Sequence, residues 1–274
     1  SPSYDMLSVL LSELQYTMED NPELPVDERD FVMAYSGFIK KQATMMYVET
    51  MDQRWDDLYW RTVLFEAPYL FESYLIYMEK DRSPMKRFYL PRRKTLKVVV
   101  DDLQDLEDRK LDFYGLSMPS RVGKSTICIF FLSWVAGKRP NSHSAMGGHS
   151  GKLAKGFYGE LLNLVNTREY KFSEIFPDSP LQKTSAEDLE INLDEPDRFA
   201  TITCRGIDGT WTGAVDVSAD GYLYVDDLIR DREHSLNPIR MENTYQEYLN
   251  KMVDRKNDGA KELMVGTRWN IIDH

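Results

Sequence analysis

What the sequence has little of narrows the classes of protein it can belong to. Its 274 residues include only two cysteines, Cys128 and Cys204, which supply neither a disulfide framework nor a zinc site and fit a reducing compartment. No apolar run approaches the roughly 20 residues that span a membrane. The first residues lack the basic and apolar regions of a signal peptide. We therefore expect no membrane partner and a location outside the secretory pathway.

Positive charge is also scarce. The chain has 34 Lys and Arg against 45 Asp and Glu, which gives a formal net charge of −11. This balance argues against a protein that coats nucleic acid, because such a protein needs a broadly basic surface. Hydrophobic residues make up 42% of the chain, close to the globular average, so a folded core is expected.

The first part of the chain has a helical pattern. Apolar residues recur at helical spacing over residues 1–85, which predicts a helical N-terminal subdomain. Within the run 27–49 we expect one apolar face, made of Phe31, Tyr35, Phe38 and Ile39. The aromatic residues of the stretch 55–78 are interpreted as core packing rather than as a binding surface.

Residues 86–274 have a different texture, in which short apolar segments alternate with helical patterns. We expect strands at 111–116, 142–147, 199–204, 222–226 and 262–266, and helices at 124–136, 151–166 and 237–254. Strands that alternate with helices in this way predict an α/β fold, with a mainly parallel sheet covered on both faces.

A candidate phosphate-binding loop follows the first of these strands. The segment 111–116 is interpreted as a buried strand, and Gly137 is expected to end the apolar helix that follows the loop. Strand, turn, Gly-Lys-Ser and helix form the context that a phosphate loop requires. The residues expected to contact ATP are Pro119, Ser120, Arg121, Val122, Gly123, Lys124, Ser125 and Thr126.

In such a loop Lys124 bridges the β- and γ-phosphates and Ser125 ligates Mg²⁺. Met118 stands where the full G-x-x-x-x-G-K-[ST] pattern has its first glycine. The alternative interpretation, a surface turn before a helix, does not explain why Gly and Lys lie directly between an apolar strand and an apolar helix.

Two carboxylates end a later apolar strand, in the sequence Tyr222-Leu-Tyr-Val-Asp226-Asp227. Beside a phosphate loop, this strand places Asp226 near Mg²⁺ and Asp227 near the attacking water. The strand near 142–147 adds a strand between the two motifs, as in P-loop ATPases. Guanine-specific N-K-x-D is not met, because in Asn250-Lys-Met-Val-Asp254 the acid comes one residue late; we reject a GTPase.

Together these motifs resemble the large terminase subunit of tailed bacteriophages, from about residue 111 onward. The residues that carry the resemblance are the Pro119–Ser125 loop, Val225-Asp226-Asp227, Gly209-Thr210-Trp211-Thr212-Gly213 and Val265-Gly266-Thr267-Arg268-Trp269. The resemblance implies a P-loop ATPase motor that moves double-stranded DNA into a procapsid. It also implies a homo-oligomeric ring on the portal protein, with the small terminase subunit as a further partner, in the host cell cytoplasm.

The resemblance also implies roles for single residues. Arg121 matches the loop arginine that contacts the γ-phosphate, while Gly266, Thr267 and Arg268 match the coupling motif that relays hydrolysis to movement. Arg92, in the segment 88–93, lies where the family contacts adenine, although an exposed basic turn explains it equally well. The arginine finger stays open among Arg205, Arg230, Arg232 and Arg240, since Thr212 stands where some relatives carry an arginine.

One departure and three alternatives accompany the resemblance. A full-length terminase continues into a nuclease domain, so from this chain we expect ATP hydrolysis without DNA cleavage. A single chain is expected to be a monomer that binds DNA weakly and in a salt-dependent way. The alternatives are a helicase-like translocase, an assembly module that binds ATP without turnover, and a nucleotide kinase, which has the least support.

Overall fold

The structure is a computed structural model that describes residues 2–119, 121–195 and 197–267. The chain divides into two compact units, Ser1–Lys80 and Asp81–His274, and each is described by itself. Among the described residues, no helix combines the length and the apolar character needed to cross a membrane.

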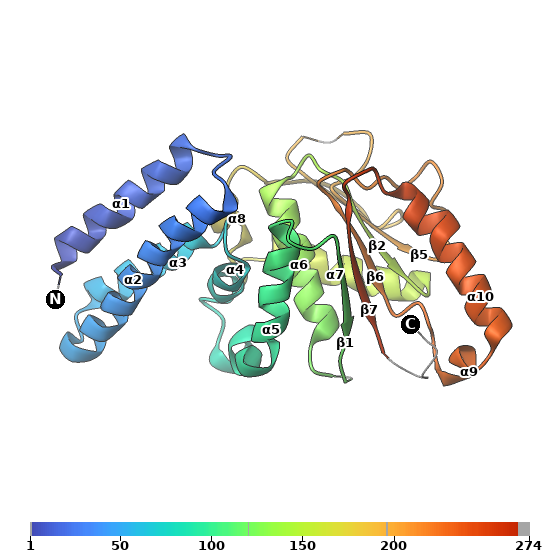
Figure 1. Cartoon of the computed structure of the whole chain (residues 1–274), viewed down its shortest axis with the longest axis horizontal. Helices are drawn as coiled ribbons and strands as arrows, with labels where there is room; N and C mark the ends of the chain where they lie inside the picture. Colours follow the sequence, from blue (N-terminus) through green and yellow to red (C-terminus); the bar gives the residue numbers. More distant parts are fainter. Residues whose placement is uncertain (1, 120, 196, 268–274) are drawn as a thin grey trace. The chain divides into compact units, whose positions relative to one another are not determined.

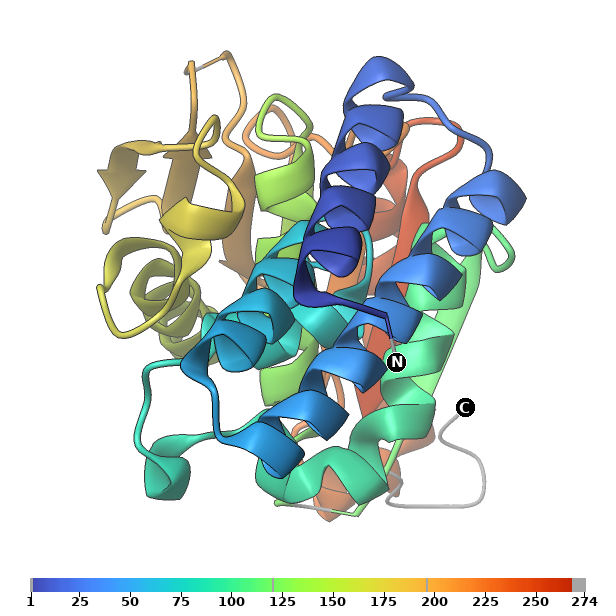
Figure 2. The ribbon, with the colours of Figure 1, turned by 90° about the vertical axis from the view of Figure 1, so that its left-hand side faces the viewer.

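The first unit is helical, as the sequence predicts. Its helices are α1 (Tyr4–Asp20), α2 (Val26–Thr50), α3 (Gln53–Glu66) and α4 (Phe71–Met78). Figure 2 shows α1 and α2, in blue, lying side by side. The helical spacing of Leu7, Leu11 and Leu14 buries one face of α1 against α2 and α3, and the Ser3 side chain caps the helix by accepting from the Met6 N–H.

The apolar face expected on α2 is not one face. Ile39 is fully buried with Val32 and Ala43, whereas Phe31, Tyr35 and Phe38 are 44–65% exposed. The physical reason is helix geometry: Ile39 shares its face with residues four and seven positions away, whereas Phe38 points about 100° to the side. The interpretation of the stretch 55–78 as core packing is confirmed by its buried aromatic residues, which are Trp55, Phe65, Phe71, Tyr74 and Tyr77.

A buried carboxylate ties three helices of this unit together. Glu66, 1% exposed at the end of α3, accepts from the Ser36 hydroxyl (2.6 Å) and the Lys40 ammonium (2.5 Å) of α2 and from the Ser73 hydroxyl (2.6 Å) of α4. Because a buried charge is stable only when it is paired and hydrogen-bonded, these three partners make the carboxylate tolerable.

The Glu66→Ala variant is therefore expected to lose about 2 kcal/mol of unfolding free energy, because it leaves polar partners without an acceptor inside the helical unit. Urea unfolding measures the loss. The matched control, Glu49→Ala at the exposed end of α2, should change stability by no more than about 0.5 kcal/mol. Equal stability of the two variants would contradict the role given to Glu66.

The second unit is an α/β domain. Its elements are, in chain order, α5 (Tyr89–Glu107), β1 (Phe113–Ser117), α6 (Lys124–Lys138), β2 (Ser144–Gly148), α7 (Gly151–Asn166), α8 (Phe172–Ile175), β3 (Leu181–Ser185), β4 (Glu190–Leu193), β5 (Ile202–Gly206), β6 (Tyr222–Asp226), α9 (Arg232–Ser235), α10 (Pro238–Glu247) and β7 (Lys261–Gly266). A short 3₁₀ turn, Pro84–Lys86, precedes α5. A π-helical turn, Tyr248–Met252, and a 3₁₀ turn, Val253–Arg255, follow α10.

Seven strands of the described chain form one sheet in the order β1-β7-β6-β2-β5-β4-β3. The first five strands are parallel to one another, whereas β4 and β3 add an antiparallel edge that the sequence pattern does not predict. The prediction of a mainly parallel α/β sheet is confirmed. In the sequence, β2 comes between β1 and β6. In the sheet, however, β7 lies between β1 and β6, and β2 pairs with the other edge of β6.

Two local predictions are wrong. The segment 111–116 was expected to be a buried strand, but β1 lies at the sheet edge, where only Leu116 is buried and Phe113 is 52% exposed. Gly137 was expected to end α6, but the helix continues to Lys138. Gly137 is instead a close-packing position, because a Cβ atom there would lie 2.2 Å from the ring of Phe176.

Helices α5, α6 and α7 lie on one face of the sheet and α10 on the other (Figure 1). Successive side chains of β6 point alternately to these two faces of the sheet. Tyr222 packs edge-on against Phe131 of α6, whereas Leu223 and Val225 belong to the cluster around Trp211 on the opposite face. Since side chains alternate, Asp226 points to the same face as Tyr222, toward α6.

Candidate active site

The candidate site lies where three parallel strands end together. In the register of the sheet, Ser117 of β1 pairs with Gly266 of β7, and Asp226 of β6 pairs with Val265. The carboxyl ends of β1, β7 and β6 are therefore level with one another. Loops that follow such ends are the usual location of ligand sites in open α/β sheets. This register brings together the loop, acidic and Gly266-Thr267 motifs, which are far apart in the sequence.

The loop between β1 and α6 depends on a glycine. Gly123 caps α6 with φ 99°, and a Cβ atom there would lie 2.6 Å from the ring of Phe88. That ring stacks on Phe130 (centroids 5.7 Å apart, planes at 10°), and the Arg92 guanidinium lies 5.3 Å from its centroid. The segment expected near adenine thus lies against the loop. Within it, Phe88 and Arg92 are the side chains closest to Gly123, whereas Tyr89 is fully buried.

Lys124 connects the ends of β1 and β7. Its side chain is nearly buried, with the residue 7% exposed. The Nζ atom donates to Thr267 Oγ1 (2.5 Å) and lies 3.3 Å from the carbonyl oxygens of Met118 and Gly266. All of these partners are neutral oxygens, so the positive charge of Lys124 stays available to an anion at the N-terminus of α6.

Asp226 is a buried carboxylate, 1% exposed, that accepts from the hydroxyl groups of Tyr224 and Ser125. Burial raises the pKa of Asp226 to about 6, and repulsion by Asp227 adds to the rise. Both hydroxyl groups and the charge of Lys124 lower the pKa. The carboxylate is therefore mostly ionised at neutral pH but incompletely compensated, which suits it to a divalent cation.

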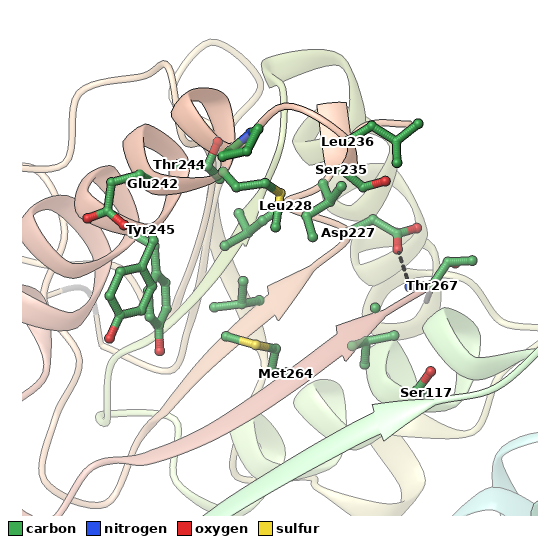
Figure 3. A pocket seen from close by; sticks show the side chains of 17 residues that line it. Ser117, Asp227, Leu228, Ser235, Leu236, Glu242, Thr244, Tyr245, Met264 and Thr267 are labelled. Atoms are coloured by element: carbon green, nitrogen blue, oxygen red, sulfur yellow. Dashed lines mark hydrogen bonds between the residues drawn. The ribbon is translucent and has the colours of Figure 1, made fainter. Parts of the chain in front are cut away.

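Asp227 has an unusual backbone that three hydrogen bonds hold. Its φ of 44° lies in the left-handed region that non-glycine residues rarely adopt. The Asp227 N–H donates to Val265 O (2.9 Å), its carbonyl oxygen accepts from His149 Nδ1 (2.9 Å), and its carboxylate accepts from the Thr267 N–H (3.1 Å), the bond drawn in Figure 3. The side chain is only half-buried, unlike that of Asp226.

The remaining expected contact residues have varied environments. Pro119 and Arg121 are exposed, and Val122, Ser125 and Thr126 are half-buried. Arg121 has φ 68°, and its side chain makes no hydrogen bond or ion pair with another described residue. Ser120 and Arg268 lie outside the described residues.

The four arginines considered for the finger have different surroundings. Arg205 pairs with Glu190 and donates to the carbonyl oxygen of Asp188, and Arg240 pairs with Glu233. Arg230 and Arg232 are exposed. Their contacts do not distinguish one of the four.

Two residues of the site were missed in the sequence. Tyr224 lies two positions before Asp226, so strand alternation alone predicts that both side chains share a face. His149 directly follows β2, the strand next to β6, but the sequence cannot reveal that neighbour. The next residue, Ser150, caps α7, since its Oγ atom accepts from the Leu153 N–H (3.3 Å).

No protein-family model matches the chain, and no curated protein sequence matches it. Chemistry is therefore assigned to this site from its residues and geometry. Among the described residues, no group of three His, Cys, Asp or Glu side chains is placed to hold a metal ion. A single hydroxyl and a single carboxylate, Ser125 and Asp226, nevertheless fit Mg²⁺, which proteins commonly bind through one or two side chains together with substrate phosphates.

The raised pKa of Asp226 predicts how stability depends on pH. The folded state holds a proton on Asp226 up to about pH 6, whereas an unfolded aspartate releases it near pH 4, so folding loses stability as pH rises between these values. The loss is about 3 kcal/mol. Asp226→Asn should therefore be stabilised relative to the unaltered chain at pH 7.5 but not at pH 4, as measured by urea unfolding.

The control for this measurement is Asp258→Asn, which changes an exposed aspartate and should leave the difference between the two pH values unaltered. A stability difference for Asp226→Asn that is the same at both pH values would show that burial does not raise the pKa of this carboxyl group.

Proposed function

We propose that this chain hydrolyses ATP with a P-loop type site and is the motor part of a large terminase subunit. One observation carries the proposal. Lys124 donates to the Thr267 hydroxyl, and the Thr267 N–H donates to the Asp227 carboxylate, so residues of three separate motifs form one hydrogen-bonded chain. The strand order supports the same class, because β7 lies between the loop strand and the acidic strand.

Each residue then has a distinct task. Gly123 and the N-terminus of α6 receive the phosphates, and the Lys124 ammonium neutralises their charge. Ser125 and Asp226 hold Mg²⁺, which supplies further positive charge to the phosphates when bound. Asp227 orients the attacking water and accepts its proton. Arg121, exposed in the loop, stabilises charge that develops on the γ-phosphate.

The contacts of Lys124 also suggest how hydrolysis is coupled to movement. Lys124 cannot approach a phosphate fully while its ammonium holds the Thr267 hydroxyl and the Gly266 carbonyl oxygen. Nucleotide binding therefore competes with the contacts at the end of β7, and phosphate release restores them. Gly266 and Thr267 become the residues that report the nucleotide state to the rest of the chain.

Asp227→Asn should keep ATP binding but lower kcat at least about 100-fold, because the amide cannot accept the proton of the water. Nucleotide affinity and phosphate release measure the two effects separately. Asp254→Asn, which alters an exposed aspartate outside the site, should retain both activities. Full turnover by Asp227→Asn would remove Asp227 from the chemistry.

The motor proposal includes double-stranded DNA as substrate, a ring on the portal protein, the small terminase subunit as partner, and action in the host cytoplasm. The net charge of −11 favours weak, transient DNA contact over a tight grip. A helicase-like translocase and an assembly module that binds ATP without turnover would act differently on DNA and ATP, so experiments can separate them from the motor.

Phosphate release by the chain should rise at least several-fold when portal protein and double-stranded DNA are added together, because a ring brings a neighbour's arginine to each site. Stimulation by single-stranded DNA with strand separation would favour a helicase-like translocase instead. ATP binding with no turnover under any condition would favour an assembly module.

A further inference from the structure

A cavity of about 560 Å³ lies under α10, on the face of the sheet opposite α6. Figure 3 shows it from close by: Glu242 and Tyr245 of α10 stand on one side, Asp227 and Thr267 on the other, and Leu228 and Met264 lie between them. Its volume is within the range of small-molecule sites, which are mostly apolar with a few polar groups.

Among the described residues, the charges along this cavity have one sign. Asp227 and Glu242 are the charged side chains among the described residues that line it, and none of these residues is Lys, Arg or His. Neither carboxylate forms an ion pair with a described residue. Asp227 accepts from the Thr267 N–H, and Glu242 accepts from the neutral side chain of Gln246 (2.9 Å). A phosphate-bearing ligand is therefore disfavoured, and a cation is favoured.

Aromatic rings supply the second feature. Tyr245 and Tyr248 line the cavity from α10 and the π-helical turn after it, with their ring centroids 6.2 Å apart. The Tyr248 hydroxyl is engaged by the Glu262 carboxylate, which fixes the ring. Tyrosine faces attract both flat rings and cations, and Met264 adds a polarizable surface that suits an aromatic partner.

We propose that this cavity binds a small aromatic amine. The ring of the ligand lies among Tyr245, Tyr248 and Met264, and its ammonium group pairs with Glu242, while the charge of Asp227 at the other end also favours a cation. This cavity shares Asp227 and Thr267 with the proposed ATP site but favours the opposite charge in a ligand, and its occupancy does not depend on ATP hydrolysis. Because Asp227 and Thr267 form one end of it, a bound amine lies beside the hydrogen bond that joins the ends of β6 and β7.

Three probes of nearly equal size and shape test the proposal by calorimetric titration of the full chain without nucleotide. Tryptamine carries an ammonium group, tryptophol a hydroxyl group and indole-3-propionate a carboxylate. Tryptamine should bind saturably and about tenfold more tightly than tryptophol, and indole-3-propionate should bind more weakly than either. No saturable tryptamine binding, or equal affinity for tryptamine and tryptophol, would overturn the proposal.

Two variants locate the binding. Glu242→Gln should weaken tryptamine about threefold to fivefold without changing tryptophol, whereas Tyr245→Leu should weaken both. The matched control is Glu247→Gln on the same helix, because Glu247 pairs with Lys251 and does not line the cavity; it should bind all probes as the unaltered chain does. Unaltered tryptamine affinity in Glu242→Gln would place the amine elsewhere and refute the proposal.

Folding of these variants can be checked by circular dichroism, and α10 has no buried residues, so it should tolerate the changes. The result is also separate from the proposed function. A chain that binds tryptamine but does not hydrolyse ATP refutes only the ATPase, whereas a chain that hydrolyses ATP but does not bind tryptamine refutes only the amine site.

Discussion

The second unit is built around a buried carboxylate, Asp226, whose negative charge is only partly compensated. Every residue of β6 is buried, and this strand delivers Asp226 to the face beneath α6. Transfer of a carboxylate from water into a protein costs several kcal/mol unless opposite charge and hydrogen bonds offset it. Two hydroxyl groups and the charge of Lys124 offset part of that cost, and the remainder raises the pKa of Asp226 to about 6. The site therefore keeps uncompensated negative charge at the position where it would receive a cation.

At the beginning of the same strand, by contrast, a buried carboxylate has its charge fully paired. The Tyr222 hydroxyl donates to Glu107 (2.7 Å), which also accepts from Lys138 (2.7 Å) and from both terminal nitrogens of Arg139 (2.6 and 3.0 Å). These cations hold the pKa of Glu107 well below its usual range despite burial. The first residue of β6 thus contacts a carboxylate whose charge is fully paired, Glu107. The last residue, Asp226, is a carboxylate whose charge is only partly compensated. The paired end anchors β6 to α5 and α6, which leaves the other end able to respond to ligands.

The sequence predicted the elements of the site better than their neighbours. The strand 222–226 was predicted with the bounds that the structure has, because an apolar run ending in two acids is a local signal. Strand order is not local: the edge position of β1 and the place of β7 depend on pairings across more than a hundred residues. Gly137 was misjudged for the same reason, since the ring that requires a glycine comes from a distant segment. Tyr224 needed only strand alternation, whereas the role of His149 needed the sheet.

The central place of β7 between β1 and β6 aligns the two parts of the candidate site. Strands β1 and β6 do not pair with each other. Each pairs with β7, so β7 positions both the loop that follows β1 and the two acids at the end of β6. A slip of β7 by one residue would move it about 3.3 Å against both neighbours and turn each of its side chains to the opposite face. The position of the loop relative to the two acids therefore depends on the register of one six-residue strand, β7.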